Sequence, residues 1–253
     1  MMLSQIFSKK PRIFFIHVPK TGGTSVNSAI QRHYGRQSYI LDPIGTKAMA
    51  KLIYQSVPSV ERGTYILRDS FILDAMNRDV SYISGHAHFN QKIWERYSQK
   101  YAYVTLLRDP VKRYISNYFF DASKNKGDHS YVEQSLLDFL KTRRGIRRGH
   151  LYINYFSGFP IERDYDLSKL SQRVEIAKQN ILKFDCVGIL ENLQGFKERF
   201  KKQFRLTLRI PHQNKNPVVN PLVESHLLKV IQEICQPDIE IYEFMKLHCL
   251  KQA

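Results

Sequence analysis

The stretch RIFFIHVPKTGGTS, residues 12–25, decides the fold of this chain. Its first half, Arg12 to Val18, is an apolar run rich in β-favouring residues, as expected of a strand buried on both faces of a parallel sheet. Two glycines follow, and from Ser25 to about Tyr34 the apolar residues recur at helical spacing. The stretch therefore predicts a strand, a glycine-rich turn and a helix. Such a turn brings backbone N–H groups and the positive end of the helix dipole together, which suits an anion such as phosphate.

A second unit of the same kind follows later in the chain. Tyr101 to Leu107 is an apolar strand candidate, Arg108-Asp109-Pro110 breaks it, and Val111 to Phe120 has a helical pattern. Further strands are expected at Tyr82 to Ser84 and Asp185 to Ile189, and further helices at Leu167 to Leu182 and Leu193 to Phe204. Strands that alternate with helices predict a three-layer, P-loop-like α/β fold with a mostly parallel central sheet flanked by helices.

Length, charge and cysteine content limit the possible classes of protein. The 253 residues fit a single domain over 1–253. A net charge of +16 attracts polyanions, so a polyphosphate cofactor, an anionic glycan and nucleic acid all fit. Three cysteines without a C-x-x-C pair favour neither a disulfide framework nor a zinc site. Because residues 1–11 hold no apolar run long enough for a signal peptide or a membrane anchor, we expect a cytoplasmic protein.

The first turn carries the groups that phosphate-binding loops use. Its glycines let the backbone approach a ligand closely, its hydroxyls add donors, and its lysine supplies a mobile cation. The candidate binding residues are Lys20, Thr21, Gly22, Gly23, Thr24 and Ser25. The lysine precedes the glycines, whereas in the Walker A pattern G-x-x-x-x-G-K-[ST] it follows them. A nucleoside triphosphatase is therefore disfavoured.

The second turn adds a second candidate anion site. Arg108 ends a strand, so it is expected at the carboxyl edge of the sheet, where α/β folds bind ligands. Ser116 follows two helical turns later. An arginine fork with a hydroxyl can hold a phosphate, and together the two turns imply a ligand with phosphates at two separated positions.

These two segments resemble a known family. FFIHVPKTGGTS at 14–25 and LRDPVKRYIS at 107–116 are similar to the 5′-phosphosulfate loop and the 3′-phosphate motif of sulfotransferases that use PAPS (3′-phosphoadenosine 5′-phosphosulfate). The type is the membrane-associated one, which includes heparan sulfate 2-O-sulfotransferases and bacterial relatives. Weaker similarities continue at 154–158, 187–191 and 211–216. The resemblance implies that residues 20–25 bind the 5′ end of PAPS, and that Arg108 and Ser116 bind its 3′-phosphate.

The segment SGHAHF at 84–89 resembles the part of that family that carries the catalytic base. An imidazole with a pKa near neutrality can take a proton from an attacking hydroxyl. His86, directly after Gly85, is the predicted base. His88 lies at the alternate position of an extended chain, and we expect it to face the other way and to orient or contact the acceptor.

The resemblance also implies the reaction. A sulfuryl group would pass from PAPS to an acceptor hydroxyl, and Lys20 would stabilise the charge that grows on the bridging oxygen of the departing PAP (3′,5′-adenosine diphosphate). No cluster of carboxylates accompanies the two turns, so no essential metal is expected. By family analogy alone, a glycan or glycolipid ranks ahead of a protein tyrosine or a small alcohol as acceptor, and nucleic acid is not expected as a partner.

Two polar segments, 123–130 and 142–150, are predicted to be surface loops, and the second holds four arginines. That cluster is either a solvated face or a site for an acidic acceptor, for which Arg144 and Arg147 are the candidates. A P-loop kinase of small molecules is the main alternative function, because it shares the fold and the loop logic. A basic nucleic-acid-binding protein is a third possibility that the charge leaves open.

Overall fold

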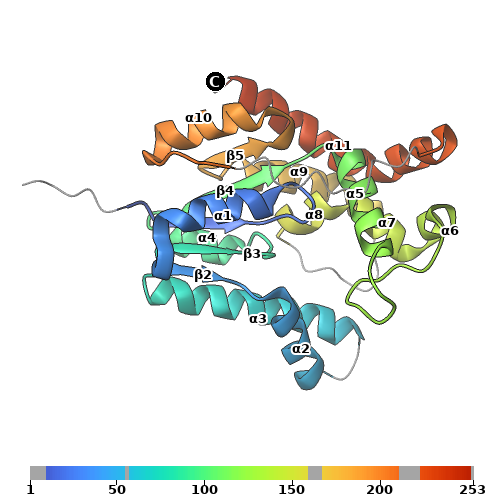
Figure 1. The fold of residues 1–253 in the computed structure, drawn as a ribbon, viewed down its shortest axis with the longest axis horizontal. Helices are drawn as coiled ribbons and strands as arrows, with labels where there is room; N and C mark the ends of the chain where they lie inside the picture. Colours follow the sequence, from blue (N-terminus) through green and yellow to red (C-terminus); the bar gives the residue numbers. More distant parts are fainter. Residues whose placement is uncertain (1–9, 55–56, 159–166, 211–222, 252–253) are drawn as a thin grey trace, which may run out of the picture.

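The computed structural model describes residues 10–54, 57–158, 167–210 and 223–251, with a five-stranded sheet at the centre (Figure 1). Every neighbouring pair of strands is parallel. The spatial order is β2 (Ser38–Ile40), β3 (Tyr82–Gly85), β1 (Ile13–Ile16), β4 (Ala102–Leu107) and β5 (Cys186–Ile189). The predicted α/β fold with a parallel central sheet is confirmed, and the predicted strands are present within one or two residues of their expected ends.

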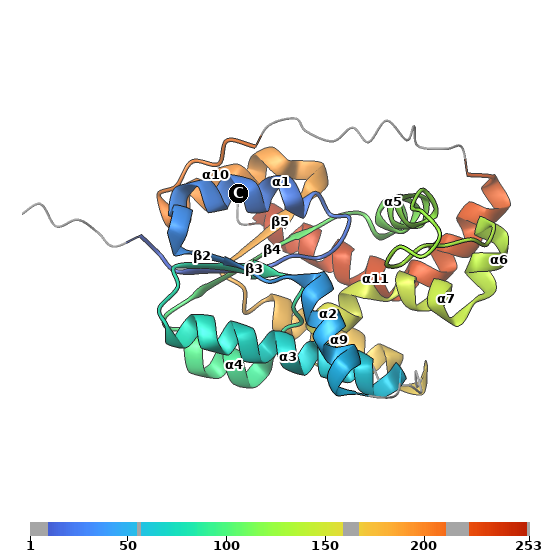
Figure 2. The same ribbon diagram turned by 60° about the horizontal axis from the view of Figure 1, so that its bottom comes forward.

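Helices cover both faces of the sheet, which gives three layers (Figure 2). One face is covered by α1 (Gly23–Tyr34) and α10 (Leu193–Phe204), and the other by α3 (Val57–Asn77), α4 (Gln91–Tyr97), α8 (Leu151–Phe156) and α9 (Leu170–Ile181). The remaining helices are α2 (Pro43–Ile53), α5 (Pro110–Ala122), α6 (Leu136–Lys141), α7 (Arg143–Gly149) and α11 (Ser225–Lys251), with short 3-10 turns at Gly35–Gln37, Leu167–Lys169 and Leu190–Asn192.

The first strand explains why its sequence is apolar at every position. Side chains alternate across a strand, so Phe14 and Phe15 point to opposite faces. Phe14 joins the core under α3, α4 and α9, whereas Phe15 joins the core formed with α1 and α10. Because both faces are covered, polar residues are excluded from the strand until His17.

Helices α5 to α7 and the first half of α11 pack beside the sheet around a third core. A fully buried ion pair joins them, because Arg113 on α5 lies 3.7 Å from Asp238 on α11. The Asp238 carboxylate also accepts hydrogen bonds from the backbone N–H groups of Tyr152 and Ile153 at the start of α8. Arg113, which belongs to the second sequence motif, is therefore a structural residue of the core.

The prediction of a surface loop at 142–150 is wrong, because Arg143–Gly149 form helix α7. Thr142 caps the helix by accepting a hydrogen bond from the backbone N–H of Gly145. A Cβ atom on Gly145 would lie 2.0 Å from the backbone oxygen of Phe139, and one on Gly149 would lie 2.5 Å from Ile234 on α11. The glycines suggest a loop in sequence, but here they allow close packing of α7. The other predicted loop, 123–130, is present.

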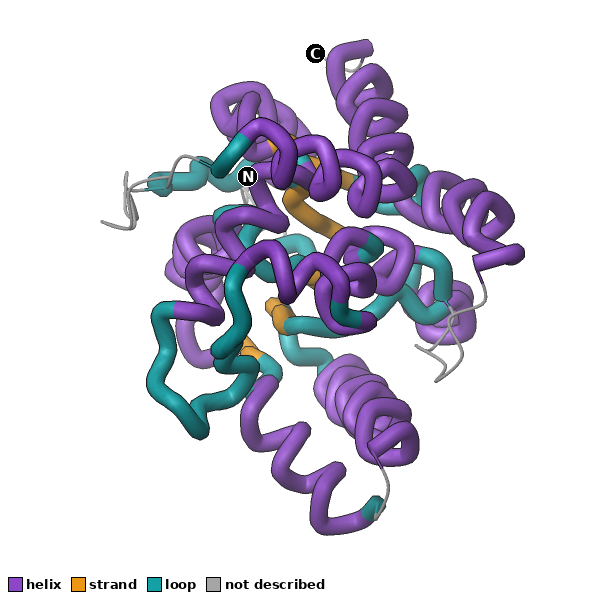
Figure 3. The backbone as a smooth tube through the Cα atoms, turned by 90° about the vertical axis from the view of Figure 1, so that its right-hand side faces the viewer, coloured by secondary structure: helices purple, strands orange, loops and turns teal. Residues whose placement is uncertain are grey.

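The strand order changes direction at β1 and β4. From β1 the chain crosses to the edge strand β2 and returns to β3, which lies between β2 and β1, and it later continues on the other side of β1 with β4 and β5. At such a switch point the loops that leave two neighbouring strands separate, and ligands bind outside the carboxyl ends of the strands. Figure 3 looks onto the side of the molecule where α5 and α7 lie, with the strands surrounded by helices.

Candidate active site

The turn after β1 leaves the amino end of α1 open for an anion. Lys20 and Gly22 have left-handed backbones, with φ of 65° and 80°. Gly22 caps α1 without a side-chain hydrogen bond, and the first turn of the helix holds no acidic residue. Within the described part of the chain, no capping side chain therefore takes up the first backbone N–H groups of α1, and the helix dipole adds positive potential at this point.

Backbone conformation and close neighbours favour glycine at both positions of this turn, since the φ of 80° at Gly22 strains other residues and Gly23 packs against a ring. A Cβ atom on Gly23 would lie 2.2 Å from the imidazole of His17, and one on Gly22 would lie 2.8 Å from the Leu190 side chain. The hydroxyl of Thr21 is buried and donates to the backbone oxygen of Val18 at 2.9 Å, so it closes the turn. Thr24 is exposed and Ser25 is half-buried. Among the hydroxyls of the predicted loop residues, these two are therefore at or near the surface, whereas that of Thr21 is not.

Lys20 connects the two turns. Its backbone oxygen accepts a hydrogen bond from the Arg108 guanidinium at 3.1 Å. Its ammonium lies over the ring of Phe120, 3.8 Å from the ring centre. Burial lowers the pKa of Lys20 below its usual value, and the nearby positive charge of Arg108 lowers it further. An anionic group beside Lys20 would relieve both effects.

The second turn is held by side chains. The Tyr152 hydroxyl donates to the backbone oxygen of Arg108 and accepts from its N–H at 2.8 Å. Asp109 caps α5 by accepting from the backbone N–H of Lys112 at 2.8 Å. Ser116 is half-buried and lies one helical turn before Phe120, on the face that Lys20 contacts. The structure thus brings the two predicted anion turns together at neighbouring strand ends.

His86 follows the end of β3 and has a defined tautomer. Its Nδ1 lies 2.7 Å from the backbone oxygen of His17, which accepts, so Nδ1 carries the proton and Nε2 is free to accept one. The Arg68 guanidinium donates to the backbone oxygen of His86 at 2.8 Å. Burial lowers the pKa of His86 more than the hydrogen bond to the His17 oxygen raises it. The neutral, proton-accepting form therefore persists below pH 6.5.

His88 has a different environment from His86. Its ring stacks on Tyr65, with ring centres 3.8 Å apart, and lies 4.9 Å from the ring of Tyr155. Burial lowers its pKa to about 3, and its Nε2 is buried without a hydrogen-bond partner in the described structure. His88 does not line the cavity described next. Its surroundings are those of a packing residue that backs the wall formed by Tyr65 and Tyr155.

Lys20 and His86 both line a cavity of about 870 Å³, whereas the other predicted cofactor residues, Thr21 to Ser25, Arg108 and Ser116, are not part of its lining. Its other walls come from α2 and α3 on one side and from α5, α7 and the 123–131 loop on the other. The lysines and arginines that line it outnumber its carboxylates; the cations are Lys20, Lys47, Arg68, Lys124, Arg143, Arg144, Arg147 and Arg148, and the carboxylates are Glu61, Asp121 and Asp128. Such a lining concentrates anions.

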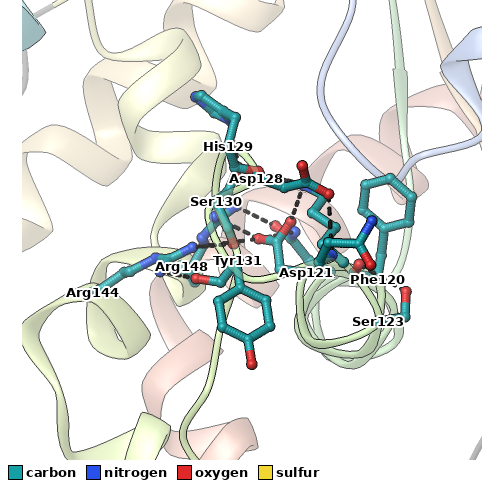
Figure 4. A network of polar contacts seen from close by, with 12 residues as sticks. Phe120, Asp121, Ser123, Asp128, His129, Ser130, Tyr131, Arg144 and Arg148 are labelled. Carbon is teal, nitrogen blue, oxygen red and sulfur yellow. Dashed lines mark hydrogen bonds and ion pairs between the residues drawn. The ribbon is translucent and has the colours of Figure 1, made fainter.

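Asp121 organises the cations on the α5 side (Figure 4). This buried carboxylate accepts from Arg148 and from Lys124, each at 2.7 Å, and lies 3.8 Å from Arg144. Arg144 also donates to the backbone oxygens of Ser130 and Tyr131. Arg144 therefore fixes the loop, and of the two arginines predicted to bind acceptor, Arg147 is the less constrained on this wall.

Residues 4–245 match the model of the sulfotransferase family. The chain belongs to this family. It is also 24% identical over 272 residues to heparan-sulfate 6-O-sulfotransferase 2 of Danio rerio, an alignment that covers 92% of this chain and 57% of that relative. The chain thus spans little more than half the length of that curated relative. The kinase and nucleic-acid-binding alternatives receive no support from these matches.

Two further properties of this sulfotransferase-family chain bear on its partners. None of the helices in the described ranges is long and apolar enough to cross a membrane. The described residues also contain no group of three His, Cys, Asp or Glu side chains that could hold a metal ion. Of the weaker sequence similarities, Asn154 lines the cavity and Glu191 accepts from the backbone N–H of Asp109, whereas residues 211–216 lie outside the described part of the chain.

Sequence reasoning missed three residues that shape this site. The sequence motifs give His17 no role in the site, yet its ring packs on Gly23 and lies 4.6 Å from the His86 ring, centre to centre. Arg68 and Phe120 carry no motif, and only the fold brings them to His86 and Lys20. The position of His17, directly between the first strand and the glycine turn, was the one available signal.

Proposed function

We propose that this protein transfers the sulfuryl group of PAPS to a hydroxyl group of an acidic carbohydrate. The observation that carries the proposal is that Lys20 and His86 line one cavity, while Lys20 also belongs to the turn before α1 and accepts a hydrogen bond from Arg108. A charge-stabilising cation, a proton acceptor and two anion-binding turns are the parts that sulfuryl transfer needs. Membership of the sulfotransferase family supports the reaction, since sulfotransferases generally use PAPS.

The residues of the two turns fit the two ends of PAPS. Gly22 and Gly23 leave room for the backbone to approach the 5′-phosphosulfate, and the α1 N–H groups with Thr24 and Ser25 would hold it. The guanidinium of Arg108 would bind the 3′-phosphate with the Ser116 hydroxyl. Lys20, already close to Arg108, would contact the bridging oxygen. Thr21 would contribute through its backbone, because its hydroxyl is used within the turn.

The proposed reaction assigns one role to each of these residues. The acceptor oxygen forms a bond to sulfur while the bond between sulfur and the bridging oxygen breaks, and PAP leaves with the negative charge. His86 Nε2 takes the proton of the acceptor hydroxyl, and the backbone oxygen of His17 stabilises the imidazolium through Nδ1–H. Lys20 stabilises the charge that develops on the leaving oxygen. No step requires a metal ion, and we expect activity in the presence of a chelator.

The acceptor is proposed from the cavity and from the relative. Acid groups on a carbohydrate complement the lysines and arginines of the lining, and the similar zebrafish protein carries heparan sulfate in its name. The candidate acceptor residues on the cavity are Arg147 and Arg144. His88 lies behind the wall formed by Tyr65 and Tyr155, so it would act on the acceptor indirectly. A cytoplasmic location remains a prediction, supported by three cysteines that are all buried and free.

His86→Ala tests the assignment of the base. We expect kcat to fall roughly 10²-fold or more while PAP binding and the fold are retained, because removal of the proton acceptor affects the transition state. In the unaltered protein the rate should rise with pH through a midpoint below 6.5, since only neutral imidazole accepts a proton and burial lowers its pKa. That limb should vanish in the variant.

His88→Ala is the matched control, measured by transfer of labelled sulfate and by thermal shift with PAP. We expect it to alter acceptor KM and stability, and to keep the pH limb. Loss of turnover in His88→Ala with normal turnover in His86→Ala would show that the base is His88 and that its assignment to His86 is wrong. Failure of PAP to stabilise the protein more than ATP with magnesium would contradict the proposed reaction itself.

A further inference from the structure

Two polar contacts cross the cavity from one wall to the other. One wall, the hairpin wall, consists of α2 and α3, and the other, the arginine wall, consists of α5, α7 and the 123–131 loop. Arg147 on the arginine wall lies 3.2 Å from Glu61 on the hairpin wall. His129 Nε2 and the Lys47 ammonium, also from opposite walls, are 3.2 Å apart.

Arg147 differs from the other arginines beside it in where its partner lies. Arg148 is paired with Asp121, and Arg144 is held by backbone oxygens of the 123–131 loop, so both are fixed within the arginine wall. In the described structure the polar partner of Arg147 is Glu61, which belongs to the opposite wall. An anionic ligand that enters between the walls would therefore compete with Glu61 for Arg147.

Exposure separates this pair from the Asp121 pairs. The Asp121 side chain is 4% exposed, whereas the Glu61 side chain is 42% exposed. A buried carboxylate that loses its cations is costly, but a partly solvated carboxylate can return to water with little loss. The contact between Arg147 and Glu61 is thus the exchangeable one.

We infer that Glu61 is a specificity-determining residue that occupies Arg147 until an anionic group of the acceptor replaces it. The inference rests on the proposed function, because it concerns the acceptor side of the same cavity. A carboxylate or sulfate group on the acceptor takes over Arg147, and Glu61 turns to solvent. An acidic acceptor must displace Glu61 to reach Arg147, whereas a neutral acceptor offers Arg147 no anion and leaves the contact with Glu61 in place. Glu61 therefore lowers the affinity for acidic acceptors by competition and has little effect on the affinity for neutral ones.

Two oligosaccharides of equal length test this point. The first is a fluorescent hexasaccharide with uronic acid carboxylates, and the second is the same molecule after its carboxylates have been reduced to alcohols. Their affinities are measured by fluorescence anisotropy at pH 7.5 for the full chain with PAP bound. Glu61→Gln keeps the shape of the side chain and removes the competing charge. It should tighten binding of the acidic hexasaccharide about 3- to 10-fold and leave the reduced one unchanged.

Glu243→Gln and Arg147→Gln complete the design. Glu243 is exposed, is paired with Lys246 on α11 and does not line the cavity, so its change controls for net charge alone. Arg147→Gln should weaken binding of the acidic hexasaccharide. In the double variant with Glu61→Gln, the affinity should be the same as in Arg147→Gln alone. The inference is overturned if Glu61→Gln acts equally on both hexasaccharides or on neither, if Glu243→Gln matches it, or if the acidic hexasaccharide does not bind.

The same samples separate this inference from the proposed function. If PAP stabilises the protein and labelled sulfate is transferred, but Glu61→Gln has no selective effect, only the role of Glu61 fails. If neither PAP stabilisation nor sulfate transfer occurs, the proposed function fails whatever the hexasaccharides show.

Discussion

The two turns of the candidate site have the same architecture but differ in how the helix that follows each turn is capped. Both connect a buried parallel strand to a helix, β1 to α1 and β4 to α5. The residue before α1 is Gly22, which has no side chain to cap the helix. The residue before α5 is Asp109, whose carboxylate accepts a hydrogen bond from the backbone N–H of Lys112. In the proposed function the first turn would therefore bind an anion through its backbone, and the second would bind one through side chains such as Arg108.

This difference teaches that similar strand–turn–helix units can divide one ligand between them. A backbone site is sensitive to anything that adds a side chain, because the peptide must approach the anion closely. A side-chain site is sensitive to loss of its guanidinium and tolerant of changes at the helix cap. The predictions below challenge this division, in order of decreasing effect.

Lys20→Ala should have the largest effect, and on turnover. In the proposed mechanism the lysine stabilises a charge that develops only in the transition state, so we expect kcat to fall roughly 10²- to 10³-fold. The dissociation constant of PAP should change much less, since the α1 amides remain. Single-turnover sulfate transfer and calorimetric titration of PAP measure the two quantities. Equal losses in both would make Lys20 a binding residue only.

Gly23→Ala should come next, and it should act on binding. The new Cβ atom would lie 2.2 Å from the His17 ring, so the turn or the imidazole must shift. Several N–H donors to the phosphosulfate would be misplaced together, and we expect PAP affinity to fall roughly 10²-fold. Thr24→Ala, at an exposed neighbouring position, is the control and should cost less than tenfold. Near-normal PAP affinity in Gly23→Ala would contradict a backbone site.

Sequence predicted the parts of the site that are local. The strand at 12–18, the glycine turn and Arg108 at a strand end follow from periodicity and residue type within a few positions of each other. The pairing of Arg147 with Glu61 joins residues that are far apart in sequence, so no local pattern could reveal it. The sequence does not predict helix α7 for a related reason. Its glycines allow close packing against Phe139 and Ile234, and these contacts exist only in the folded structure.

Arg108→Ala should weaken PAP binding roughly 10- to 100-fold, the usual effect of losing a charged hydrogen-bonding partner of a phosphate. Turnover at saturating PAPS should change less, because the 3′-phosphate is remote from the reacting sulfur. The comparison of PAP with adenosine 5′-monophosphate, which differs from PAP only in lacking the 3′-phosphate, isolates the contact. Affinity for the latter should be unchanged in Arg108→Ala. A similar loss for both ligands would show that Arg108 supports the first turn through Lys20 instead.

Asp109 gives the smallest effect and the cleanest separation of capping from binding. Asp109→Ala removes the acceptor of the Lys112 N–H, which should lower the free energy of unfolding by about 1 kcal/mol. Asp109→Asn keeps a capping side chain and removes only the charge, so stability should be retained. Because Asp109 is a negative charge near Arg108, both variants should bind PAP as well as the unaltered protein or slightly better. If Asp109→Ala weakened PAP binding tenfold while Asp109→Asn did not, the amino end of α5 would itself contact the ligand, and the two turns would bind their anions in the same way. Thermal unfolding and PAP titration of the two variants decide between these outcomes.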